Sequence, residues 1–261
     1  MILHIPYFSE LGVETISLIP IPARIIAAER ELSDLLAYPQ ERFEEIIRDV
    51  GFRCDCCSQC CTRAFNGHVF LLDRDTVRAR EIDPQSVEPA PFPEFCDQNG
   101  TFYVSGYALK AKDDDPGSCY FLENTRCRIY DQRFSICRVY PYMLHREPDE
   151  NGNTDWRQIA GLSEHGEYHT EIPDSSCRQT AAETREYEAA VIRQEIAFLT
   201  CIRDHFLQNG LRHVQKIHDD RMREFRRGGE IRVMVYFNGH LEEHRIPGKG
   251  IPRSKGTPQE I

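Results

Sequence analysis

The densest chemical feature of this 261-residue chain is a stretch of eight residues, Cys54 to Cys61, that holds five of its eleven cysteines. Cys54, Cys57 and Cys60 repeat with two residues between neighbours, which is the spacing of three ligands in bacterial ferredoxins. Thiolates are soft ligands, and a short loop that repeats them can wrap one face of a metal ion or an iron–sulfur cluster. The stretch therefore predicts a metal–thiolate site.

A second group of cysteines lies downstream and can complete the ligand set. Side chains of neighbouring residues diverge, so Cys60 and Cys61 suit two adjacent sites, or one cluster with an outer thiolate, better than one tetrahedral ion. Eight thiolates would serve two four-thiolate sites. The predicted ligands are Cys54, Cys57, Cys60, Cys61, Cys119, Cys127, Cys137 and Cys177. The alternative interpretation is a set of small buried hydrophobic residues.

The remaining cysteines fit this pattern less well. Cys201 lies in a helical pattern among apolar residues and is expected in the core, and Cys96 stays undecided. Cys56 interrupts the spacing and could be a spare or redox-active thiol. Near the second group lie four arginines that could offset the charge of an anionic centre or pair with acids such as Glu123. These are Arg126, Arg128, Arg133 and Arg138.

Composition restricts the setting of this site. The net charge of -10 argues against a nucleic-acid partner, because phosphate binding needs a basic surface. The start of the sequence lacks the features of a secretory signal, and its apolar run Ile16 to Ile21 is too short to span a bilayer. We therefore expect a cytoplasmic protein without a membrane contact. Thiols stay reduced there, which favours metal ligation over disulfides.

The elements around the cysteines predict an α+β fold, with N-terminal helices, a compact cysteine-rich core, a helical C-terminal region and a terminal β-hairpin. Two helices are expected from Pro22 and from Pro39 to a cap at Gly51. The predicted divisions are a strand and helical pair (1–50), the cysteine-cluster domain (51–180), C-terminal helices and hairpin (181–246) and a disordered tail (247–261).

Within these divisions, hydrophobic periodicity and turn residues predict the individual elements. Expected strands are Gly67 to Leu72, one strand or hairpin over Thr101 to Lys110, runs near 139–147 and 155–162, and a hairpin of Ile231 to Phe237 with His240 to Ile246. Expected helices are Asp73 to Arg80, 181–208 and 211–226, and residues 83–97 are expected as a loop.

The two cysteine blocks resemble the YkgJ-like family of cysteine-cluster proteins, also described as a zinc- or iron-chelating CxxCxxCC domain. In both, Cys-x2-Cys-x2-Cys-Cys precedes a short strand and an Asp-containing helix. The second block here reads Cys119-Tyr-Phe-Leu, Cys127-Arg-Ile-Tyr, Arg133 and Cys137-Arg-Val-Tyr-Pro, with Cys177 at the position of a late family cysteine. Ser58 stands where the family has glycine, and Phe134 where it has proline. The resemblance covers about residues 50–180.

Flagellin lysine N-methylases carry a similar cysteine domain, so the resemblance implies an iron–sulfur or zinc-dependent modification enzyme. The sequence has no Gly-x-Gly-x-x-Gly loop for a methyl donor and points to no catalytic residue. Two hypotheses remain. The first is an iron–sulfur protein, with one or two clusters, that has a redox role or acts as an oxidoreductase or N-methylase-like enzyme on a protein substrate. The second is a non-enzymatic zinc protein that binds a protein partner through its C-terminal helices.

Overall fold

The computed structural model describes residues 20–142, 144–148, 154–159 and 165–248. Its helices and small sheets confirm the predicted α+β class. The strand expected in residues 1–20 falls outside the described residues except for residue 20. The tail expected at 247–261 is described only at its first two residues, and the first of these, Pro247, ends a strand instead. No helix in the described part of the chain is long and apolar enough to cross a membrane.

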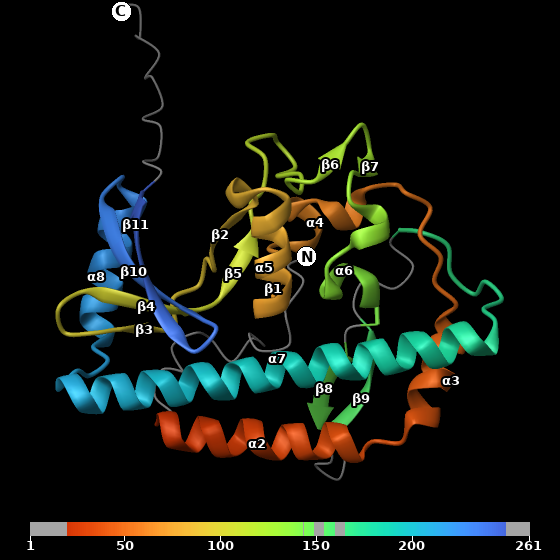
Figure 1. The fold of residues 1–261 in the computed structure, drawn as a ribbon, viewed down its shortest axis with the longest axis horizontal. Coiled ribbons are helices and arrows are strands. Elements are labelled where there is room, and N and C mark those ends of the chain that lie inside the picture. The colour runs from red at the N-terminus through yellow and green to blue at the C-terminus, as the bar shows by residue number, and fades with distance from the viewer. Residues whose placement is uncertain (1–19, 143, 149–153, 160–164, 249–261) are drawn as a thin grey trace, which may run out of the picture.

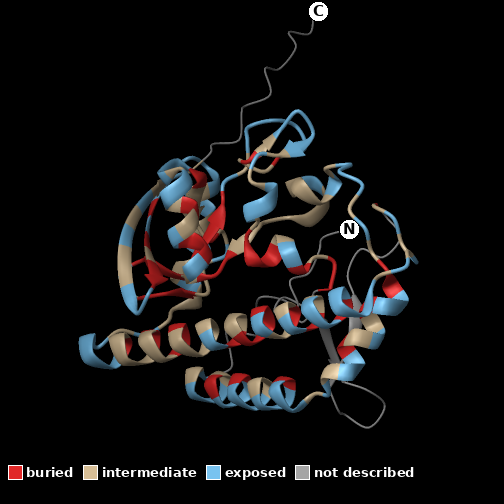
Figure 2. Ribbon diagram, turned by 45° about the vertical axis from the view of Figure 1, so that its right-hand side comes forward, coloured by how far each residue is buried: buried red, intermediate tan, exposed pale blue. Residues whose placement is uncertain are grey.

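The molecule is built on one long helix, α7 (Asp174–Asn209), which runs along its whole width (Figure 1). Helix α2 (Ile21–Ala37) lies beside it, and α3 (Gln40–Val50) packs against it near its N-terminal end (Figure 1). Buried residues concentrate where these helices face each other and the sheets (Figure 2). Leu35 and Ile192, both fully buried, belong to this shared core. Apolar positions three and four residues apart place such side chains on one helix face.

A four-stranded sheet joins the C-terminal hairpin to the middle of the chain, in the order β11-β10-β4-β3. Its strands are β3 (Phe95–Cys96), β4 (Thr101–Ser105), β10 (Glu230–Phe237) and β11 (His240–Pro247). Strands β10 and β4 run parallel, with buried Val235 opposite buried Val104. The predicted hairpin is confirmed, and its turn at Asn238-Gly239 has positive φ at both residues, as a tight two-residue turn requires.

Residues 101–110 do not form the hairpin that was one of the two predictions for them. Strand β5 (Tyr107–Leu109) pairs with β1 (Phe70–Leu71) and β2 (Val87–Pro89), whereas β4 belongs to the other sheet. Gly106 lies between β4 and β5 with φ +73, and its N–H donates to Tyr236 O at 3.0 Å. The chain therefore crosses from one sheet to the other at this glycine, where a left-handed backbone is least costly.

Several other boundaries differ from the sequence prediction. The expected loop 83–97 contains β2, which pairs with β5, and β3, which pairs with the neighbouring strand β4. Helix α7 starts at Asp174 rather than near 181, so Cys177 lies in its first turn. The remaining elements are α4 (Arg63–Asn66), α5 (Asp73–Ile82), β6 (Leu122–Glu123), β7 (Arg126–Cys127), α6 (Ser135–Val139), β8 (Leu144–Pro148), β9 (Thr154–Ile159) and α8 (Gln215–Arg226).

Candidate metal centre

Backbone hydrogen bonds hold the chain in place just before the first cysteine segment. Gly51 ends α3 in the left-handed conformation, and Arg53 exchanges two backbone hydrogen bonds with Glu167 at 2.8 and 3.0 Å. Beyond this ladder, Cys56 and Ser58 both have positive φ, near +60°. Glycine adopts this conformation without a steric cost, whereas a residue with a Cβ such as Ser58 adopts it less readily. The loop is thus a tight, irregular turn that exposes Cys56 and Cys57.

Backbone hydrogen bonds bring the second block to the end of the first. The N–H of Cys119 donates to the carbonyl oxygen of Cys61 at 2.8 Å, and the N–H of Arg63 donates to Gly117 O at 2.9 Å. The chain then turns through the β6–β7 hairpin, which ends at Cys127, and continues to α6, which carries Cys137. Three separate segments therefore supply cysteines to one region.

Five of these thiols interact electrostatically and form what we call the thiol cluster. Sγ of Cys60 and Sγ of Cys61 are 4.0 Å apart. The pKa of Cys119 is raised to about 11, chiefly by burial and in part by the Cys61 and Cys127 thiols. Burial also raises the pKa of Cys137, again with contributions from neighbouring thiols. The members of the thiol cluster are Cys60, Cys61, Cys119, Cys127 and Cys137.

Backbone N–H groups partly oppose this effect of burial. At Cys57, Cys119 and Cys127, burial raises the thiol pKa, and the N–H of the residue two positions later acts in the opposite direction. An N–H aimed at sulfur favours the charged thiolate, the form that binds metal. The raised pKa values mean that thiolates at this site need a further positive charge. A metal ion supplies that charge, so the donor set fits a metal.

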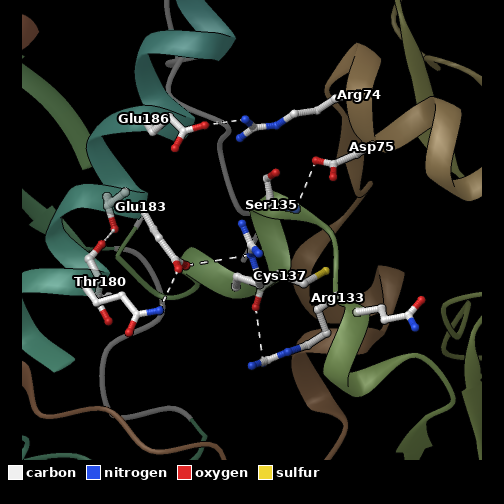
Figure 3. Close-up of polar contacts among 12 residues, drawn as sticks. Arg74, Asp75, Arg133, Ser135, Cys137, Thr180, Glu183 and Glu186 are labelled. Carbon is white, nitrogen blue, oxygen red and sulfur yellow. Dashed lines mark hydrogen bonds and ion pairs between the residues drawn. The ribbon is translucent and has the colours of Figure 1, made fainter.

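Arg133 is the arginine whose positive charge acts on the thiol cluster. It works against the raised pKa that burial gives to Cys127 and Cys137. Its guanidinium lies 4.1 Å from the centre of the Tyr130 ring, and its Nη1 is 3.4 Å from Cys137 O (Figure 3). Its Nε is buried and has no hydrogen-bond partner within the described ranges. A buried N–H donor that has no acceptor and lies beside thiols fits an anionic metal–thiolate centre, because the thiolates would accept its hydrogen bond.

The other three arginines take different positions. Arg128 pairs with Glu123 at 3.1 Å, as the alternative interpretation expects, and Arg138 lies 3.8 Å from Glu183. Arg126 is exposed. The sequence alone did not distinguish these three arginines from Arg133 as possible counter-charges for the metal centre.

The exposed loop lies near Tyr130. Burial raises the pKa of the Tyr130 hydroxyl, Arg133 lowers it, and the Cys54 and Cys56 thiols raise it. Cys54 and Cys56 are therefore close to the ring over which Arg133 lies.

Three cysteines lie elsewhere. Cys177 is fully buried in the first turn of α7, among core residues that include Leu35, and its thiol is 3.8 Å from Ile172 O. Cys96 is fully buried in β3, where burial raises its pKa to about 12. Cys201 packs half-buried against a second core cluster, as predicted. Cys177 thus lies in an apolar core, and its role as a ligand stays a prediction.

The sulfur atoms are not arranged as a preformed site. Among the residues described, no three His, Cys, Asp or Glu side chains are close enough to hold a metal ion. Ligation would therefore draw the sulfur atoms of the thiol cluster closer together.

Two residues near the thiols did not stand out in the sequence. His165 is buried among the rings of Phe52, Phe65 and Tyr140, close to the first cysteine segment. Asp75 is buried at the start of α5 and binds the start of α6. The sequence signals for Asp75 are its place in the first turn of a predicted helix, a common position for acids, and the Asp-containing helix of the family that the chain resembles.

A half-buried thiol cluster with N–H donors and an adjacent cation is typical of a cysteine-rich metal-binding domain. Residues 53–177 match the model of the CxxCxxCC family, described as a "putative zinc- or iron-chelating domain". No curated protein and no solved structure matches the chain. The match confirms the expected family and supports metal binding by the cysteine cluster.

Proposed function

We propose that the protein is an iron–sulfur protein with a redox or protein-modification role. The observation that carries this proposal is the ferredoxin-like spacing of Cys54, Cys57 and Cys60 beside the thiol cluster. Cys54 and Cys57 lie on the adjoining loop and are proposed to join the five thiols of the cluster as ligands. A zinc ion and a common iron–sulfur cluster each take four thiolates, so the number of thiols allows a second site of either kind, and the spacing is what favours iron–sulfur.

The chain's own residues have separate tasks in this proposal. The thiolates bind, the N–H groups of Phe121 and Ile129 donate toward the sulfurs of Cys119 and Cys127, and Arg133 offsets negative charge. A bound cluster supplies one-electron chemistry. Because a reduced cluster carries one more negative charge, Arg133 would favour electron uptake. The exposed loop around Cys56 and Cys57 is the side from which a protein partner or protein substrate would reach the centre.

A second candidate is a non-enzymatic zinc protein that binds a protein partner. The elements between Cys119 and Cys137 favour it, because they are two-residue strands and a five-residue helix, too short to be stable without a cross-link. A structural metal supplies such a cross-link. A pocket bordered by Cys61 and Cys119 has room for about one water molecule, which also suits a structural role.

Metal analysis of protein purified without oxygen separates the two candidates. We expect brown protein that contains iron and acid-labile sulfide and loses its visible absorption when a reductant is added. Colourless protein with stoichiometric zinc and no iron would overturn the iron–sulfur proposal in favour of the zinc protein.

A further inference from the structure

The helix that carries Cys137 is held by a buried carboxylate. The side chain of Asp75, on α5, is 1% exposed, and its Oδ2 accepts a hydrogen bond from the backbone N–H of Ser135 at 3.0 Å (Figure 3). Ser135 is the first residue of α6, two positions before Cys137. A helix of five residues has little stability of its own, and its first N–H groups have no partner within the helix. The contact with Asp75 supplies such a partner.

Arg78, one turn later on α5, holds the same segment at further points. Its Nη1 is 3.4 Å from Oδ1 of Asp75, and its Nη2 donates to the carbonyl oxygen of Gln132 at 2.6 Å. Its guanidinium also lies 5.7 Å from the centre of the Phe134 ring. Asp75 and Arg78 therefore form hydrogen bonds to the backbone on both sides of Arg133, at Ser135 and at Gln132.

The cost of burying an unpaired carboxylate explains why these hydrogen bonds hold the segment in one position. An unpaired charge would be very unfavourable at this depth, so Asp75 is stable there while both partners stay in place. Moving the segment 132–135 would break the bond to Ser135. The same segment carries Arg133, and Cys137 follows it, so a shift would displace both the cation and one thiol of the thiol cluster.

We propose that Asp75 and Arg78 are a positioning pair that sets the place of Cys137 and Arg133 in the metal centre. The pair touches no metal and acts through the backbone of residues 132–135. This inference rests on the proposed function only in requiring that the thiol cluster binds a metal, whether iron or zinc.

The test compares Asp75→Asn with Asp73→Asn on the same helix. Asp73 Oδ2 accepts the N–H of Asn238 at 3.0 Å, remote from Cys137 in the sequence, which makes it a matched control. The measurement is the rate at which the metal carried on purification passes to a chelator. We expect release about 10–100-fold faster from Asp75→Asn, the usual effect of losing a residue that supports a ligand, and an unchanged rate from Asp73→Asn.

Ser135→Pro tests the same hydrogen bond from its other side. Proline removes the N–H, fits the first position of a helix, and follows a residue whose ψ of 160° is compatible with it. Ser135→Pro should release metal as fast as Asp75→Asn. The effects of the two changes should not add in the double variant, because both weaken the same contact between Asp75 and Ser135.

Release is measured at a temperature where circular dichroism shows each metal-free variant to be folded. A merely structural role for Asp75 would lower the melting temperature and leave release at that temperature unchanged. Release at the wild-type rate from both Asp75→Asn and Ser135→Pro would overturn the inference alone. Wild-type protein that carries neither iron nor zinc would overturn the proposed function with it.

Discussion

At the scale of single residues, cysteine side chains in this protein lie in different chemical environments. Cys137 and Cys177 were both predicted as ligands from spacing and resemblance. Cys137 lies among thiols with Arg133 beside it, whereas Cys177 lies among apolar side chains under α2 and α3. Sequence spacing identifies thiols that can reach a metal, but it does not show which of them meet. That depends on where α6 and α7 pack.

Alanine at these two positions should have different effects. Cys137→Ala is expected to lose metal, because a thiol of the cluster is removed. Cys177→Ala should keep the wild-type metal content and lower the free energy of unfolding by about 1 kcal/mol, the usual cost of a small loss of packing. Elemental analysis and urea unfolding measure the two quantities. Loss of metal from Cys177→Ala would instead support its predicted role as a ligand.

At the scale of elements, local patterns predicted what local forces determine. The end of α3 at Gly51 and the turn between β10 and β11 were both read from the residue types that left-handed backbone needs. The partners of β4 were not predicted, because no local signal marks a strand that pairs in parallel with a remote one. The same limit applies to the segment around Gly166, which supports the first cysteine segment from far along the chain.

Gly166→Ala tests that support. Gly166 has φ +73, and an added Cβ would lie 2.4 Å from Cε2 of Phe52 and 3.1 Å from Arg53 O. We expect a loss of about 1–3 kcal/mol in the free energy of unfolding and faster metal release, because the ladder below Cys54 and Cys57 would shift. Gly210→Ala is the control, since Gly210 has φ +61 and open space around it. Equal effects of the two variants on metal release would contradict this role.

At the scale of the whole molecule, the cysteine region and the C-terminal hairpin share one sheet. The predicted division at residue 181 separates β4 from β10, which pair directly. Helix α7 itself runs across residue 181, and it contacts α2, α3 and α6, which all precede that division. This arrangement predicts that the described residues unfold as one cooperative unit.

A core substitution far from the thiols should therefore affect the metal. Val235 in β10 is fully buried, and Val235→Ala should cost about 2 kcal/mol through lost burial and packing. We expect thermal unfolding, followed by circular dichroism, and metal release to shift together to a lower temperature. Leu207→Ala, at a side chain that is 76% exposed, should shift neither. A lower unfolding temperature with unchanged metal release would show two independent units.

The parallel pairing of β4 with β10 also has a consequence during synthesis. All of α7 and α8 lies between these strands in the sequence, so a ribosome makes both helices before β4 can gain this neighbour. Until then β4 presents an unpaired edge, and such edges invite association with other chains. The five cysteines of the thiol cluster are translated before α7, so thiols and an open strand are exposed in the same nascent chain. If metal binds before β10 is made, the thiols are protected first, and the edge of β4 stays unpaired until β10 is synthesised.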